Sequence, residues 1–428
     1  MDSVQLGPAT ARIVIADAET TKRKRNSMSD AALARSEKPS DVAMALLPLM
    51  VVVLVVFLIT GFAVPVLPLH VHQGLGFGTF VVGLVTGSQF AASIISRVWS
   101  GRFADNRGPK LTVILGLAAA MASGVIYAVS LAFVSIPAAS VSILLGGRAV
   151  LGVAESFIIT GAVTWGLALV GTESAGRVIA WIGMAMFAAL ALGAPIGTTL
   201  YGIGGLQAVA IATTLVPLTT LILVAPLSAV PVRRGEFASL LSVLGAVWLP
   251  GFGSALSSVG LGAILAFGAL ISAQRGWAPV WLVFSAFAVT LVLARMLLGH
   301  VPDKLGGARV ALACLFVEAA GLALIWLANG PVLAAIGAAL TGFGYSLVYP
   351  GLGVEAVKSA SPETRGLAMA AYTVCLDIAL GLGSPALGLI AGSMGLGSVF
   401  LTSTLAVLGA VLVTFRILHT AKATENRS

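Results

Sequence analysis

Charged residues are scarce in this chain. Asp, Glu, Lys and Arg make up 9% of its 428 residues, whereas 58% are hydrophobic. A soluble globular protein carries about 25% charged residues, which cover its water-facing surface. A chain this poor in charge cannot cover such a surface. The composition therefore excludes an ordinary soluble fold and predicts a protein whose surface mostly faces lipid.

The residues of metal sites, disulfides and nucleotide sites are also few. The chain has two cysteines, Cys314 and Cys375, and both lie in apolar runs, which excludes a disulfide framework and the usual zinc spacing. No lysine directly follows a glycine, so the GxxxxGK[ST] phosphate loop is missing from the sequence. We find no paired catalytic motif. We therefore expect no metal, no cofactor and no enzymatic activity.

Long apolar runs separated by short polar segments fill the rest of the chain. A membrane-spanning helix needs about 20 apolar residues. In a bilayer the backbone must satisfy its own hydrogen bonds, so such runs form helices. The sequence predicts an all-α integral membrane protein with twelve transmembrane helices, at 43–69, 78–100, 110–133, 139–169, 178–200, 206–228, 242–270, 278–298, 309–328, 331–357, 366–390 and 398–417.

The net charge of +8 arises from basic residues on one side of the predicted membrane. Only Arg275 falls on the other side. Because Lys and Arg concentrate in cytoplasmic loops, both termini are predicted to be cytoplasmic, in the inner membrane of a bacterium. This placement also argues against a nucleic-acid partner. The basic set is Arg97, Arg102, Arg107, Lys110, Arg177, Arg233, Arg234, Arg295, Lys304, Arg309, Lys358 and Arg365.

The N-terminal segment 1–40 is polar and lacks the apolar core of a signal peptide. We expect a disordered cytoplasmic tail, with either Met1 or Met28 as the true start.

Two halves of the chain share a pattern. The residues Arg97, Gly101, Asp105 and Gly108 recur 198 positions later as Arg295, Gly299, Asp303 and Gly306. The Gly-x-Pro of 193–195 recurs 190 positions later at 383–385. Transporter folds are often built from such repeats, with solute bound between them. We expect two pseudo-symmetric six-helix bundles at 41–228 and 242–417, a cytoplasmic linker at 229–241, and terminal tails at 1–40 and 418–428.

Three motifs resemble those of the major facilitator superfamily. The segment from Gly101 to Lys110 resembles the loop between its helices two and three, and Arg148-Ala-Val-Leu-Gly152 resembles its fourth-helix motif. Gly193-Ala-Pro195-Ile-Gly197 resembles the fifth-helix motif associated with exporters, although Ala194 stands where glycine is usual. The segments 152–157 and 353–358 further resemble a bacterial group of arabinose-efflux-like permeases.

The resemblance implies the major facilitator fold and secondary transport by alternating access. It assigns Arg148 to proton coupling and the helix-five motif to Gly193, Pro195 and Gly197. It also implies a conformational gate on the cytoplasmic side, formed by Arg97, Gly101, Asp105, Gly108, Lys110, Arg295 and Asp303.

Ionisable residues inside apolar spans are candidates for function, since each costs at least about 2.5–3.5 kcal/mol to insert. Asp377 lies near the centre of the eleventh span, where it could take up and release a proton. Arg148 and Glu155 lie two turns apart on one helix face. We expect these three residues to couple transport to protons. A structural role is favoured for Glu318, and pairing with Lys358 is an equal alternative for Glu355.

Polar and aromatic residues in the spans suggest a solute pocket. The candidates are Gln89, Trp165, Tyr345, Tyr349 and Tyr372, because an aromatic ring with a polar edge suits a sugar or a drug-like ring. The alternative is that they pack at interfaces.

The function expected from these features is proton-coupled export of a small sugar-like or drug-like solute. Proton-coupled uptake of a sugar or small organic solute is the alternative, and a non-transporting membrane receptor is a third reading that the short loops disfavour. The expected partners are a small-molecule substrate, protons and the lipid bilayer, and the expected state is a monomer.

Overall fold

The computed structural model describes residues 39–171, 175–227, 229–230, 241–360 and 365–425. The chain divides into two compact units, Met1–Leu47 and Pro48–Ser428. Residues 39–47 of the first unit begin a helix, and all contacts below lie inside the second unit.

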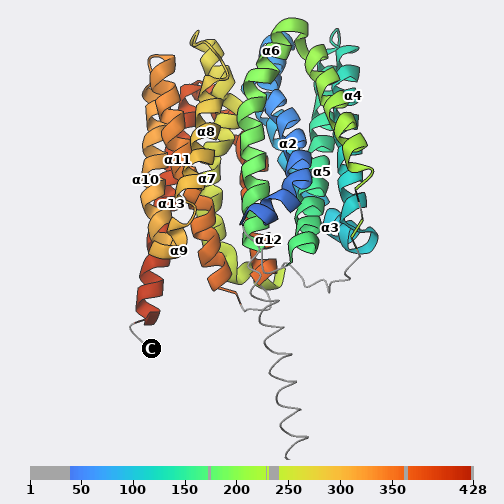
Figure 1. Ribbon diagram of the computed structural model, residues 1–428. Coiled ribbons are helices and arrows are strands. Elements are labelled where there is room, and N and C mark those ends of the chain that lie inside the picture. Colours follow the sequence, from blue (N-terminus) through green and yellow to red (C-terminus); the bar gives the residue numbers. More distant parts are fainter. Residues whose placement is uncertain (1–38, 172–174, 228, 231–240, 361–364, 426–428) are drawn as a thin grey trace, which may run out of the picture. The chain divides into compact units, whose positions relative to one another are not determined.

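The described residues form helices and no strand (Figure 1). The elements are α2 (Pro39–Leu69), the short π-helix η1 (His70–Gly74), α3 (Thr79–Arg107), α4 (Pro109–Leu131), α5 (Pro137–Val170), α6 (Ala175–Val224), α7 (Leu241–Gln274), α8 (Leu282–Leu298), α9 (Val301–Leu305), α10 (Gly307–Leu327), α11 (Pro331–Lys358), α12 (Arg365–Met394) and α13 (Gly397–Glu425).

The expected twelve crossings are present among these helices. Ten helices in the described part of the chain are long and apolar enough to cross a membrane, and the apolar α8 adds a shorter one of 17 residues. The helix α6 supplies two crossings, because its backbone leaves the helical region at Gly204 and Gly205, where Gly205 has φ +59°. Figure 1 shows α6 turning back at its upper end. The break falls between the predicted spans 178–200 and 206–228.

Helix ends differ from the predicted spans by a few residues. The eighth helix begins at Leu282 rather than at residue 278. The last helix continues to Glu425, so the segment expected as a tail from 418 begins as helix. Most of the expected tail 1–40 and linker 229–241 lies outside the described residues.

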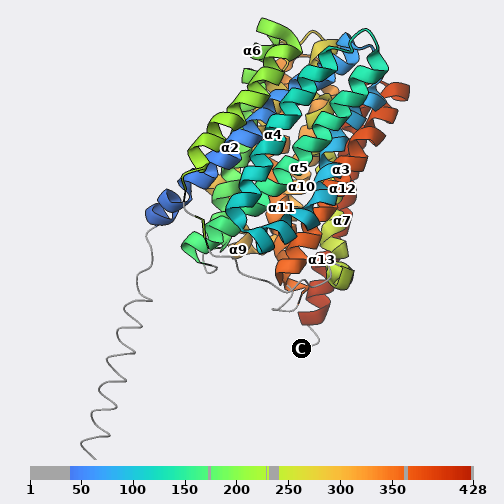
Figure 2. The same ribbon diagram turned by 90° about the vertical axis from the view of Figure 1, so that its right-hand side faces the viewer.

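The sequence repeat reappears in the packing of the helices. In the N-terminal half (α2–α6), α4 packs on α5 and α6, and α3 packs on α5. In the C-terminal half (α7–α13), α10 packs on α11 and α13, and α8 packs on α11. Helices at equivalent places in the repeat therefore have equivalent neighbours. Figure 2 shows the helices of the second unit running side by side.

Two glycines mark the repeat at the level of single residues. A Cβ on Gly152 of α5 would overlap the carbonyl oxygen of Gln89 on α3. A Cβ on Gly342 of α11 would overlap the carbonyl oxygen of Phe287 on α8 in the same way. Gly342 lies 190 positions after Gly152, and Phe287 lies 198 positions after Gln89, which are the two offsets of the sequence repeat.

The two halves meet where α3 packs on α12 and where α6 packs on α8. At the first crossing, the Thr79 hydroxyl donates to the Gly388 carbonyl at 2.7 Å. At the second, the Ser285 hydroxyl donates to the Ala191 carbonyl at 3.3 Å. These two polar contacts join the halves. Figure 2 shows α3 beside α12.

Candidate functional site: a cavity between the two halves

A cavity of about 390 Å³ lies between the two halves. Helices of both halves line it, and most of the lining side chains are apolar. A size of several hundred Å³ with an apolar wall and a few polar groups is typical of small-molecule sites. Five acidic or basic lining residues interrupt the apolar wall, namely Arg97, Arg148, Glu155, Arg295 and Asp377.

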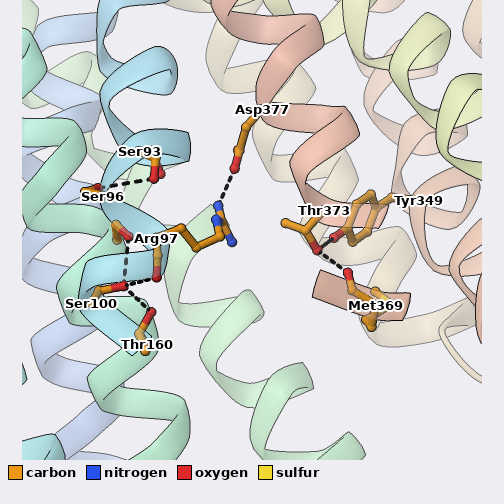
Figure 3. A network of polar contacts seen from close by, with 10 residues as sticks. Ser93, Ser96, Arg97, Ser100, Thr160, Tyr349, Met369, Thr373 and Asp377 are labelled. Carbon is orange, nitrogen blue, oxygen red and sulfur yellow. Dashed lines mark hydrogen bonds and ion pairs between the residues drawn. The ribbon is translucent and has the colours of Figure 1, made fainter. Parts of the chain in front are cut away.

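Arg97 and Asp377 form an ion pair across the boundary between the halves. The Arg97 side chain extends from α3 toward Asp377 of α12, and a guanidinium nitrogen donates to the Asp377 carboxylate (Figure 3). Asp377 is 5% exposed, whereas the Arg97 side chain is 28% exposed, so the carboxylate is the shielded partner of the pair. Removing one partner of a buried pair leaves an uncompensated charge, which is strongly destabilising. The protonation state of Asp377 therefore bears on how α3 and α12 are held together.

Glu155 is held by two short hydrogen bonds inside the N-terminal half. Its Oε1 atom accepts from the Thr60 hydroxyl of α2 and from the Gln89 amide of α3, each at 2.6 Å. All three side chains are buried and line the cavity. The sequence predicted roles for Glu155 and Gln89 but not their contact with Thr60.

Arg148 lies on the same helix as Glu155 and is 3% exposed. Its Nε and Nη1 atoms are buried and have no hydrogen-bond partner among the described residues. No carboxylate of the described chain lies within 4.0 Å of its guanidinium nitrogens. The expected polar track of Arg148 and Glu155 thus lines the cavity, without a direct ion pair between the two.

Arg295 takes the place in the C-terminal half that Arg97 takes in the N-terminal half. Its guanidinium carbon lies 5.3 Å from the centre of the Phe187 ring, and its Nη2 donates to the Ser346 carbonyl at 3.1 Å. Phe187 of α6 lies 190 positions before Asp377, so it is the counterpart of Asp377 in the repeat. The same crossing is an ion pair in one copy and a cation–π contact in the other.

Three tyrosines cluster beside the cavity in the C-terminal half. The Tyr345 hydroxyl lies 3.2 Å from the Ser258 hydroxyl, and the Tyr349 hydroxyl lies 2.9 Å from that of Thr373. Tyr345 and Tyr349 line the cavity. Tyr372 donates to the Tyr349 carbonyl at 2.7 Å and packs behind it, with ring centres 5.1 Å apart. Among the predicted pocket residues, Tyr372 and Trp165 are buried outside the cavity lining.

The predicted gate residues have different surroundings. Arg97 and Arg295 line the cavity. Gly108 and its repeat counterpart Gly306 have φ of +93° and +92° and begin the next helix, a conformation that favours glycine. A Cβ on Gly101 would meet no neighbour within 4 Å.

The acidic and basic residues of the same loops are placed differently. Asp105 is half-buried in the last turns of α3. Lys110 donates to the Ala225 and Leu227 carbonyls at 2.7 and 2.6 Å, which ties the start of α4 to the end of α6. The side chain of Asp303 lies outside the described part.

The helix-five motif packs α6 against α2. A Cβ on Gly193 would lie 2.6 Å from the Leu58 carbonyl oxygen, and one on Gly197 would lie 2.5 Å from the Phe62 carbonyl oxygen. Pro195 lies between them inside α6. The two glycines permit a close approach of helices within one half.

Two further acids lie outside the cavity lining. Glu318 is fully buried and accepts from the Ser257 hydroxyl at 2.7 Å. Glu355 pairs with Lys358 at 3.2 Å and accepts from the backbone amide of Ala308 at 3.3 Å.

The sequence did not predict the contacts that three residues of the site make. Thr60 and Phe187 were not singled out, and Arg97 was expected in a gate rather than opposite Asp377. The second offset of the repeat points from Asp377 to Phe187 and could have identified it. Nothing in the sequence indicates Thr60, because its place depends on how α2 packs.

Two pseudo-symmetric halves of apolar helices around a central cavity define a multi-pass membrane transporter. A sequence model of the Major Facilitator Superfamily matches residues 49–284 and 280–428. The chain belongs to the Major Facilitator Superfamily, whose members are secondary transporters.

Relatives and solved structures agree with this assignment. An uncharacterized MFS-type transporter of Burkholderia mallei (strain SAVP1) is 42% identical over 366 residues, which cover 83% of this chain and 87% of that protein. The uncharacterized MFS-type transporter YhhS of Escherichia coli (strain K12) is 38% identical over 361 residues, covering 84% and 89%.

Among solved structures, a D-xylose-proton symporter has a TM-score of 0.71 at 14% identity, covering 87% of this chain and 96% of that one. The nucleoside transporter NupG has a TM-score of 0.67 at 16% identity, covering 88% and 99%. At these identities the likeness supports the fold.

Proposed function

We propose that this transporter couples the movement of a small solute through the central cavity to protons, and that Asp377 is the coupling group. The observation that carries the proposal is the ion pair of Asp377 with Arg97 across the cavity. The two partners belong to different halves, so a change in their charge acts on the boundary that must rearrange during alternating access.

The proposed coupling follows from electrostatics in a shielded site. An ionised Asp377 attracts Arg97, and in a medium of low dielectric constant this attraction is strong. A proton on Asp377 removes one of the two charges and weakens the link between α3 and α12. Proton binding thus favours a state in which the halves separate at this crossing. Glu155 has a supporting role in proton coupling. It lines the same cavity, but its Oε1 atom already accepts hydrogen bonds from Thr60 and Gln89.

For the direction of transport we propose export, with uptake as the alternative. The support for export is the helix-five motif, Gly193 to Gly197, which packs α6 tightly on α2. Uptake would use the same cavity and the same coupling pair. The D-xylose-proton symporter of the same fold is an example of proton-coupled transport of a solute.

Everted vesicles separate the two directions. Respiring everted vesicles are acidic inside, so an exported solute is accumulated and its addition dissipates part of the proton gradient. A panel of radiolabelled sugars and aromatic acids, with a pH-sensitive dye, measures both effects. Accumulation that needs the gradient supports export. Accumulation only in right-side-out vesicles supports uptake and refutes export.

The remaining proposals concern topology and assembly. We propose that the basic loops, including those at Arg107 and Lys304, face the cytoplasm, since basic loops remain on that side. The protein then lies in a bacterial inner membrane with both termini inside, and the loops bearing Asp105 and Asp303 form the cytoplasmic gate. A monomer is the proposed working unit, and no enzymatic step is proposed.

A further inference from the structure

The cavity carries more positive than negative groups. Three arginines line it, namely Arg97, Arg148 and Arg295, whereas only Glu155 and Asp377 among its lining residues carry a carboxylate. The ion pair with Arg97 uses the carboxylate of Asp377. Glu155 accepts from Thr60 and Gln89. Arg148 and Arg295 therefore have no ion-pair partner among the described residues.

The unpaired arginines also retain free donors. Arg148 is 3% exposed, and its Nε and Nη1 atoms lack a partner among the described residues. The Nε atom of Arg295 also has no hydrogen-bond partner among the described residues. A buried donor left without a partner destabilises the protein, and more so when the donor is charged. A negatively charged acceptor that binds in such a site supplies the missing partner and lowers the free energy.

The apolar lining of the cavity determines what the uncharged part of a ligand can be. Around these arginines the lining is aromatic and aliphatic, with Phe57, Phe90, Phe187, Phe284 and Phe287 among its side chains. An apolar wall of this kind binds the hydrocarbon or ring portion of a ligand by removing its surface from water. A small inorganic anion would leave this wall without a contact.

We propose that the substrate is an amphiphilic organic anion, with a carboxylate-type head bound by Arg148 and an apolar body held by the phenylalanines. Arg295 supplies the second positive charge facing the head. This inference rests on the proposed role of the cavity as the solute site, and it holds for either direction of transport. A cation would add to the surplus positive charge, and a neutral sugar would leave that charge uncompensated.

Ligands of one shape and three charges test the proposal. The probes are 3-phenylpropionate, 3-phenylpropionamide and 3-phenylpropylammonium, with 2-naphthoate, 2-naphthamide and 2-naphthylmethylammonium as a second series. Their affinities are measured by calorimetry on the full chain in nanodiscs, which requires no transport. We expect the carboxylates to bind and the amides and ammonium compounds to bind at least about 10-fold more weakly, because a hydrogen bond between charged groups contributes about 1.5–3 kcal/mol.

Matched variants locate the bound head group. Arg148→Gln should weaken carboxylate binding by about 10- to 100-fold. Arg148→Lys keeps the charge but loses the planar fork, so an intermediate affinity is expected. Arg309→Gln removes the charge of an exposed arginine outside the lining and should leave binding unchanged. If Arg148→Gln does not fold, the loss is read from Arg295→Gln and from Arg148→Lys.

Three results would overturn the assignment of an anion: equal binding of amide and carboxylate, preferred binding of the ammonium compounds, or no carboxylate binding in either series at millimolar concentration. Failure of the proposed function has a separate signature. In that case the carboxylates bind and Arg148→Gln weakens them, but Asp377→Asn leaves the proton dependence of transport intact.

Discussion

Arg97 and Arg295 occupy equivalent positions in the two halves of the transporter, yet they have different partners. Arg97 pairs with Asp377 of α12, whereas Arg295 lies over the ring of Phe187 on α6. Both contacts join one half to the other. The two copies of the repeat thus share the arginine but differ at its partner. Only the contact between Arg97 and Asp377 can respond to protonation of the partner, because Phe187 does not titrate.

Moving the carboxylate to the other crossing tests this asymmetry. In an Asp377→Asn background, Phe187→Asp places a carboxylate beside Arg295, at the equivalent position of the repeat. We expect it to restore part of the proton-dependent transport that Asp377→Asn removes, as measured in vesicles. Phe187→Asn in the same background is the control, because it is polar but cannot take up a proton. Equal recovery in both variants would refute the idea.

Close helix packing in the N-terminal half predicts a sharp difference between two glycines of α5. Gly152→Ala brings a methyl group against the carbonyl of Gln89, and such overpacking costs about 1–3 kcal/mol. Gly146→Ala, on the same helix with no neighbour within 4 Å, should be neutral or slightly stabilising. Thermal unfolding in detergent compares them. Equal melting temperatures would contradict the packing of α5 on α3.

The hydrogen bonds of Glu155 predict that the oxygen matters more than the charge for stability. Glu155→Gln keeps a carbonyl oxygen for the Thr60 hydroxyl and the Gln89 amide, so the fold should be retained. Glu155→Leu leaves the buried Gln89 amide unpaired, at about 1–3 kcal/mol, whereas the Thr60 hydroxyl can still donate to the Val56 carbonyl at 3.1 Å. Thermal unfolding should therefore rank Glu155→Leu well below Glu155→Gln. The reverse order would show that the ionised form is what stabilises this site.

The proposed orientation predicts which positions a membrane-impermeant thiol reagent reaches. In a background lacking Cys314 and Cys375, Ser135→Cys lies in the connection between α4 and α5, and Lys304→Cys lies in α9. Both positions are exposed. Intact spheroplasts should label Ser135→Cys, and everted vesicles should label Lys304→Cys. The opposite pattern would invert the topology.

Much of the fold could be predicted from the sequence. Long apolar runs indicate the membrane-spanning helices. The repeated glycines at residues 108 and 306 indicate a positive-φ backbone conformation that few other residues adopt. The site was predicted only in part. Asp377, Arg148 and Glu155 could be identified because a charge within an apolar run is conspicuous, but their partners could not.

The missing partners depend on tertiary packing. The pairing of Arg97 with Asp377 joins residues 280 positions apart and depends on the packing of α3 against α12. Thr60 resembles an ordinary residue of a membrane helix until the fold places it in the cavity, and Phe187 differs from such a residue only by its place in the repeat. Trp165 and Tyr372 carry the expected chemistry, but their helices direct them away from the cavity lining.

The most direct test of the coupling role of Asp377 is whether its protonation moves the two halves. Spin labels at Arg107→Cys and Leu305→Cys, in the background without the native cysteines, mark equivalent positions of the two halves. Pulsed electron–electron double resonance then gives the distance distribution between the two spin labels as the pH is lowered. If Asp377 is the coupling group, the distribution shifts with the native Asp377 and with Asp377→Glu, and it does not shift with Asp377→Asn. A pH-dependent shift that persists in Asp377→Asn would contradict that role.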